Sequence, residues 1–247
     1  MEGFSAWVSD FISGWGQHFA MVWTDWVPMF ASGLVVTIEL LVISSLIGIV
    51  LAVPLALMRL SSRRALSWPA NLYAVFMRGT PLLVQIFLIY YGIGQFQAVR
   101  DSVLWPLFRD PYPCALIAFS LNMAAYVAEV VRGGILSVPR GEKEAALAAG
   151  MPAALMYRRV ILPRAFRLTL PALSNEVVIQ LKSTALAGTI TLLDITNVGR
   201  RLEAKTYTTE PLILAGLIYI CLTFLIARAF FYLERHFNAY QRARSSH

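Results

Sequence analysis

The sequence predicts an all-α integral membrane protein with five transmembrane helices, and two observations support this fold class. First, 58% of the 247 residues are hydrophobic and only 14% are charged. An ordinary soluble domain has about 25% charged residues. Second, five segments are long and apolar enough to cross a bilayer, which takes about 20 helical residues. A helix satisfies its own backbone hydrogen bonds, so it is the structure expected of such segments in lipid.

The five segments account for most of the chain. They cover residues 29–58, 79–94, 113–131, 165–193 and 211–233. The fourth segment is the least lipid-like, because it contains Glu176, Gln180 and Lys182. We therefore expect it to face protein or water rather than acyl chains.

The distribution of Lys and Arg predicts how these segments are oriented. Fourteen of these residues fall between the first and second spans, between the third and fourth, and in the C-terminal tail, against five on the other side. Basic residues favour the cytoplasmic side of a membrane. The N-terminus is therefore predicted outside and the C-terminus in the cytoplasm.

The predicted spans divide the chain into three parts. Residues 1–26 have aromatic side chains at helical spacing with polar residues between them, which indicates an amphipathic helix lying in the outer interface. Residues 27–235 form the transmembrane domain, with a cytoplasmic loop at 139–163. Residues 236–247 are a cytoplasmic tail.

The loop between the third and fourth spans is patterned as two short helices. Pro139 opens the first helix, and Gly150 is placed to end it as a left-handed cap. Pro152 begins a second helix over residues 153–159, which Pro163 is expected to end. Such an element suits a surface that receives force from a soluble partner. Spacing alone leaves a partnerless interfacial loop equally open.

The same loop resembles a known motif. Glu144-Ala145-Ala146, then Gly150, then Val160-Ile161-Leu162-Pro163 resembles the EAA loop (EAA-x3-G-x9-I-x-LP) of ABC-importer permeases, with Val in place of the first Ile. In that family the loop is a coupling helix that docks into the ATPase subunit. The implied ATPase-coupling residues are Glu144, Ala145, Ala146, Gly150, Met151, Leu155, Tyr157 and Arg158.

The resemblance extends over residues 33–235 and points to the polar amino acid subfamily. Arg78-Gly79-Thr80-Pro81-Leu82 and Ser183-Thr184-Ala185-Leu186 are among the segments that carry it, and the likeness is greatest to M-type subunits of histidine/lysine/arginine/ornithine permeases. It implies the type I ABC importer permease fold, as a multi-pass protein of the bacterial inner membrane with a periplasmic N-terminus. The implied partners are a cytoplasmic ABC ATPase dimer, a periplasmic amino-acid-binding protein and a second permease subunit. A heterodimer is favoured over a homodimer, because M-type subunits work beside Q-type ones.

Polar side chains at bilayer depth are candidates for the substrate pathway. A central charge costs about 2.5–3.5 kcal/mol on insertion scales, so its presence calls for a partner or a function. The candidates are Glu39, Gln85, Asn122, Glu176, Gln180, Lys182, Ser183 and Thr184. Each has an interhelical hydrogen bond as its alternative explanation.

The charged residues among these candidates suggest how an amino acid substrate is recognised. Lys182, with its two neighbours, is a candidate for the substrate carboxylate, although a regular helix places it on a different face from Glu176. Glu176 or Glu39 is the candidate for an ammonium or guanidinium group. Glu129 is expected to form an ion pair with Arg132 three residues later. Arg78 is expected to be structural.

The function predicted is that of a non-catalytic, ATP-driven importer subunit for basic amino acids (histidine, arginine, lysine, ornithine or derivatives). The chain has no Walker-type G-x-x-x-x-G-K-[ST] pattern, so ATP and magnesium are expected on the partner ATPase. No catalytic or metal-ligating set stands out, and the chain is expected to bind no cofactor and, despite its formal charge of +7, no nucleic acid. A secondary transporter or channel and a membrane-embedded enzyme are the alternatives.

Overall fold

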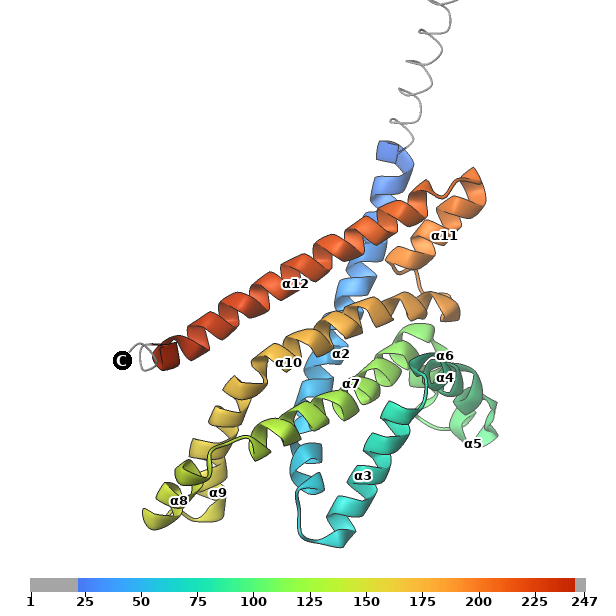
Figure 1. The fold of residues 1–247 in the computed structure, drawn as a ribbon. Coiled ribbons are helices and arrows are strands. Elements are labelled where there is room, and N and C mark those ends of the chain that lie inside the picture. Colours follow the sequence, from blue (N-terminus) through green and yellow to red (C-terminus); the bar gives the residue numbers. More distant parts are fainter. Residues whose placement is uncertain (1–21, 243–247) are drawn as a thin grey trace, which may run out of the picture.

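The computed structural model describes residues 22–242, and its regular elements in that range are all helices (Figure 1). The first described element, the π-helix η1 (Val22–Trp26), continues directly into α2 (Val27–Arg59). The rest of the predicted interfacial helix lies outside the described residues. So does the end of the predicted tail, residues 243–247.

Three long apolar helices form the frame of the molecule, namely α2, α7 (Pro111–Leu136) and α12 (Glu210–Arg242). Each is long and apolar enough to cross a membrane. The helices α2 and α7 pack closely along each other, because small residues let their backbones approach. A Cβ atom added at Gly48 would lie 2.7 Å from Met123 side-chain atoms.

The second predicted span, residues 79–94, corresponds to a helical stretch over Leu82–Gln95, and a bend joins it to a separate helix that comes before it. The amphipathic α3 (Arg64–Gly79) packs against α2 and α7, and a bend of 105° separates it from the helical stretch Leu82–Gln95. That stretch consists of α4 (Leu82–Phe87), η2 (Leu88–Gly92) and η3 (Ile93–Gln95). Pro81 explains the break, because it has no N–H to donate and forces Thr80 into an extended conformation (φ −111°, ψ 144°).

Two short helices, α5 (Gln97–Arg100) and α6 (Trp105–Arg109), lead into α7, and two more follow it. These are α8 (Arg140–Ala148) and α9 (Ala153–Met156). The prediction that Pro163 ends the second helix of the loop, α9, is wrong. α9 passes through a π-helical turn, η4 (Tyr157–Ile161), into α10 (Leu162–Ser183), and that wider turn accommodates the missing proline N–H.

The fourth predicted span is helical as far as Ile190, and a bend follows it. α10 continues as the 3-10 helix η5 (Thr184–Ile190), and α11 (Ile195–Thr206) follows at an angle of 51°. Three long helices and two bent pairs give five crossings if each pair is counted as one span. In Figure 1 the α2–α3 connection and the α8–α9 loop lie toward the same, lower end of the molecule.

Candidate functional site

A polar cavity of about 450 Å³ lies where the break between α3 and α4 faces α7 and α10. Four predicted pathway residues line it: Asn122 from α7 and Glu176, Gln180 and Ser183 from α10. The helical spacing of the α10 residues places them on one face, as the sequence indicated. The cavity also has lining residues that the pathway prediction missed, namely Arg78, Thr80 and Tyr126.

Two other predicted pathway residues, Gln85 and Thr184, are buried and do not line the cavity. Gln85 is buried, and its amide nitrogen donates hydrogen bonds to the Met77 carbonyl (2.8 Å) and to the Thr80 hydroxyl (2.8 Å). These bonds hold the α3–α4 break in place. Thr184 is buried as well, and its hydroxyl donates to the Leu181 carbonyl (2.6 Å).

Lys182 and Glu39 do not line the cavity. Both residues are exposed, and the Glu39 side chain interacts with that of Tyr112. α10 is α-helical as far as Ser183, so Lys182 points away from the face that carries Glu176. Among the described residues that line the cavity, the cation is Arg78. Lys182 lies outside this cavity, and its role in the substrate pathway stays a prediction.

The amide side chains of the cavity wall have a fixed orientation. The nitrogen of Asn122 donates to the Met77 carbonyl (3.2 Å) and to Gln85 Oε1 (3.0 Å). The nitrogen of Gln180 donates to Ser44 Oγ (2.9 Å) and to the Phe119 carbonyl (3.2 Å). A carbonyl only accepts hydrogen bonds, so the amide nitrogens must point into the protein. The amide oxygens are then the atoms left for a ligand.

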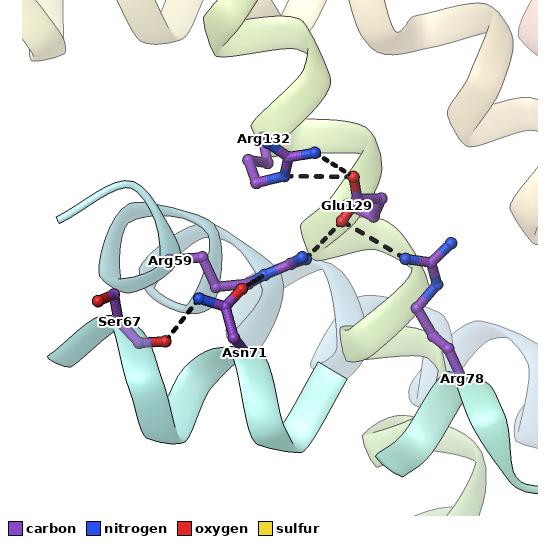
Figure 2. A network of polar contacts seen from close by, with 6 residues as sticks. All are labelled: Arg59, Ser67, Asn71, Arg78, Glu129 and Arg132. Carbon is purple, nitrogen blue, oxygen red and sulfur yellow. Dashed lines mark hydrogen bonds and ion pairs between the residues drawn. The ribbon is translucent and has the colours of Figure 1, made fainter. Parts of the chain in front are cut away.

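Beside the cavity, Glu129 is bound by three arginines (Figure 2). Its Oε1 lies 2.5 Å from Arg132 Nη2, which confirms the predicted ion pair. Its Oε2 lies 2.6 Å from Arg59 Nη1 and 3.4 Å from Arg78 Nη1. Arg59 also donates through Nε to Asn71 Oδ1 (2.9 Å). The cluster therefore joins the ends of α2 and α3 to α7.

The α8–α9 loop has the glycine cap that the sequence predicted. Gly150 has φ +73°, and its N–H donates to the Leu147 carbonyl (2.9 Å) while the Met151 N–H donates to the Ala146 carbonyl (3.1 Å). This pair of bonds is the Schellman motif. The loop is attached to the membrane helices by an ion pair between Glu142 and Arg164 (3.2 Å).

The outer face of this loop is formed by only some of the predicted coupling residues. Glu144, Ala145, Gly150 and Arg158 are exposed, and Met151, Leu155 and Tyr157 are half-buried. Ala146 is buried and packs inward. The prediction omitted Leu147, which is 59% exposed. A large apolar residue beside Ala145 and Ala146 on a polar loop is the signal that would have identified it.

Comparison with known proteins gives a consistent result. The model of the family described as "Binding-protein-dependent transport system inner membrane component" matches residues 44–239. The octopine transport system permease protein OccM of Rhizobium meliloti is 50% identical, over 86% of this chain and 87% of that protein. The nopaline permease protein NocM of Agrobacterium fabrum is 47% identical, over 88% and 91%. The histidine/lysine/arginine/ornithine permease protein HisM of Escherichia coli K12 is 38% identical, over 92% and 95%.

Solved structures agree with these sequence relatives. A crystal structure of an amino acid ABC transporter with histidines has a TM-score of 0.77 and 35% identity, over 88% of this chain and 97% of that one. An inward-facing MetNI methionine ABC transporter has a TM-score of 0.74 over 88% and 98%. The identity to MetNI is 18%, so that likeness concerns the fold alone.

Proposed function

The chain belongs to the family of binding-protein-dependent transport system inner membrane components, and from this we propose that its polar cavity carries basic amino acids or their derivatives. It is a multi-pass inner-membrane permease subunit of an amino acid ABC transporter, with the fold of type I importer permeases. Membership implies an ATPase and a substrate-binding protein as partners. The substrate, the docking residues and the pairing of permease subunits are what we propose.

The observation that carries the substrate proposal is the set of acceptors around the cavity. Glu176 supplies a carboxylate, and the amide oxygens of Asn122 and Gln180 are left for a ligand because their nitrogens are engaged inside the protein. An ammonium or guanidinium group needs such acceptors. The relatives named for octopine, nopaline, arginine and histidine transport support the same class, since octopine and nopaline each contain an arginine unit.

We further propose that the α8–α9 loop is the docking element for the ATPase. Exposed Ala145 and Leu147 give it a small apolar outer face, and Arg158 adds a positive charge beside that face. The ion pair of Glu142 with Arg164 connects the loop to the start of α10, whose other end lines the cavity. Movement of the loop is thereby passed to the cavity wall, as coupling requires.

The proposed assembly places this loop and the C-terminus in the cytoplasm and the N-terminus in the periplasm. Clustering of Lys and Arg around the loop and the α2–α3 connection supports this orientation. A second, related permease subunit completes the pathway, and we favour a heterodimer. ATP is hydrolysed by the partner ATPase and not by this chain.

Reconstituted transport tests the proposal. The chain, its partner permease, the ATPase and the binding protein are placed in proteoliposomes with ATP on the ATPase side, and uptake of labelled arginine is measured. We expect ATP-dependent uptake that lysine and octopine inhibit and that glutamate inhibits only weakly. Preferential inhibition by glutamate would overturn the substrate class. Uptake without ATP, or failure of the ATPase to associate with the chain, would overturn the transport mechanism.

A further inference from the structure

We propose that Arg78 binds the carboxylate of the transported amino acid, exchanging its contact with Glu129 for that carboxylate when the cavity is occupied. This rests on the proposed function, because it identifies the group that recognises the acidic end of the same substrate. It assigns Arg78 a role in specificity beyond the structural one that the sequence suggested.

The other side-chain hydrogen-bond donors of the cavity are engaged elsewhere, with the exception of the Tyr126 hydroxyl, which is neutral. The amide nitrogens of Asn122 and Gln180 each donate two hydrogen bonds within the protein. The hydroxyls of Thr80 and Ser183 donate to backbone carbonyls one helical turn earlier, at 2.8 and 2.9 Å. Among the described residues that line the cavity, Arg78 is the one cation. A guanidinium has five N–H donors in a planar fork that fits a carboxylate.

The position of Arg78 suits this exchange. Its side chain is 41% exposed and its guanidinium carbon lies 5.4 Å above the centre of the Tyr126 ring, which also lines the cavity. The guanidinium therefore has room to turn while it remains against the ring.

The contact between Arg78 and Glu129 is the weakest of the three ion pairs that Glu129 makes. At 3.4 Å it is longer than the contacts of the same carboxylate with Arg59 (2.6 Å) and Arg132 (2.5 Å), as Figure 2 illustrates. Glu129 keeps two partners when Arg78 leaves. The cluster has two more positive than negative charges, so a second carboxylate is favoured there. Substrate binding would thus remove one link between α3 and α7.

A comparison of arginine with agmatine tests this inference, because agmatine is arginine without the carboxylate. The chain is assembled with its partner permease and ATPase in nanodiscs, without the binding protein, and binding of both labelled ligands is measured. The wild type is expected to bind arginine about 10- to 100-fold more tightly than agmatine, the range of one or two charge-assisted hydrogen bonds. In Arg78→Gln the two affinities should become about equal, because only arginine loses a contact.

Three further variants extend the comparison of arginine with agmatine. Arg78→Lys keeps the positive charge but not the planar guanidinium, so its ratio of arginine affinity to agmatine affinity should be intermediate. This variant provides the test if Arg78→Gln fails to assemble. Lys182→Gln removes a nearby cation outside the cavity and should keep the wild-type ratio. Glu129→Gln removes the competing carboxylate and should raise the ratio.

Each outcome is decisive. An unchanged ratio in both Arg78 variants, or equal affinities in the wild type, would overturn the role of Arg78 and leave the proposed function standing. An unchanged ratio in Glu129→Gln would overturn the exchange. Absence of any arginine binding to the wild type would overturn the substrate class, and this inference with it.

Discussion

Arg59, the last residue of α2, places its Nη1 atom 2.6 Å from Oε2 of Glu129 in α7. The same side chain donates through Nε to Asn71 of α3, and it is 10% exposed. One arginine therefore joins three helices at the end of the bundle nearest the α8–α9 loop.

Replacement of Glu129 by Gln should destabilise the permease, because it leaves three clustered guanidinium groups without a counter-charge. The expected loss is about 1–3 kcal/mol, seen as a lower Tm of the purified complex. Arg109→Gln is the control. Its ion pair with Asp110 is long (3.7 Å) and exposed, so its loss should change the Tm little. Equal shifts in the two variants would contradict a stabilising role for the cluster.

Gly150→Val should uncouple ATP hydrolysis from transport. A β-branched residue is strained at φ +73°, by about 1–2 kcal/mol or more, and the Schellman motif that shapes the loop would open. The measurement is the ratio of substrate transported to ATP hydrolysed in proteoliposomes, which should fall.

Gly141→Ala is the matched control for the glycine cap. Gly141 lies in α8 of the same loop, and a Cβ at either glycine meets no atom within 4 Å. The two positions differ in that a positive φ occurs at Gly150 alone of the pair. If both variants reduced the coupling ratio equally, the conformation at Gly150 would not be the cause.

Gln85→Met should lower the Tm of the complex, because it removes the side chain that connects the α3–α4 break to α7. The Met77 carbonyl and the Asn122 amide would each lose a partner, at a cost of about 1–3 kcal/mol. Gln97→Met, at an exposed glutamine bonded to Asp101, is the comparison and should have little effect. A similar Tm for the wild type and Gln85→Met would show that the break is held by other contacts.

Gly48→Ala tests the close packing of α2 on α7. The new methyl group would lie 2.7 Å from Met123 atoms, and overpacking of this kind costs about 1–3 kcal/mol. Gly133→Ala in α7 adds the same methyl group where no atom lies within 4 Å, and it should leave the Tm equal or slightly higher. Thermal unfolding of both variants gives the comparison. A loss of stability at Gly133 alone would refute the packing argument.

Local patterns in the sequence predicted much of this structure. The cap at Gly150 and the pair of Glu129 with Arg132 were predictable because each depends on residues a few positions apart. The recruitment of Arg59 and Arg78 to Glu129 was not, because it depends on how three helices meet. Polarity at bilayer depth selected Glu176 and Gln180, which line the cavity, and also Lys182, which is exposed, because polarity alone does not distinguish a cavity wall from an exposed face.

The bends were harder to predict than the helices. Both Pro81 and Pro163 come within two residues of a helix, yet α3 ends before Pro81 while the chain remains helical through Pro163. The difference lies in the preceding backbone, which is extended at Thr80 and forms a π turn before Leu162. A proline alone does not determine which of these occurs.

Arginine uptake by Glu176→Gln tests the central claim most directly, namely that the acceptors of the cavity recognise a cationic substrate. In ATP-loaded proteoliposomes that contain the full transporter, the variant should raise the KM for arginine about tenfold or more, since it removes one charged hydrogen-bond acceptor. Uptake of arginine with the same KM in Glu176→Gln and the wild type would contradict the account.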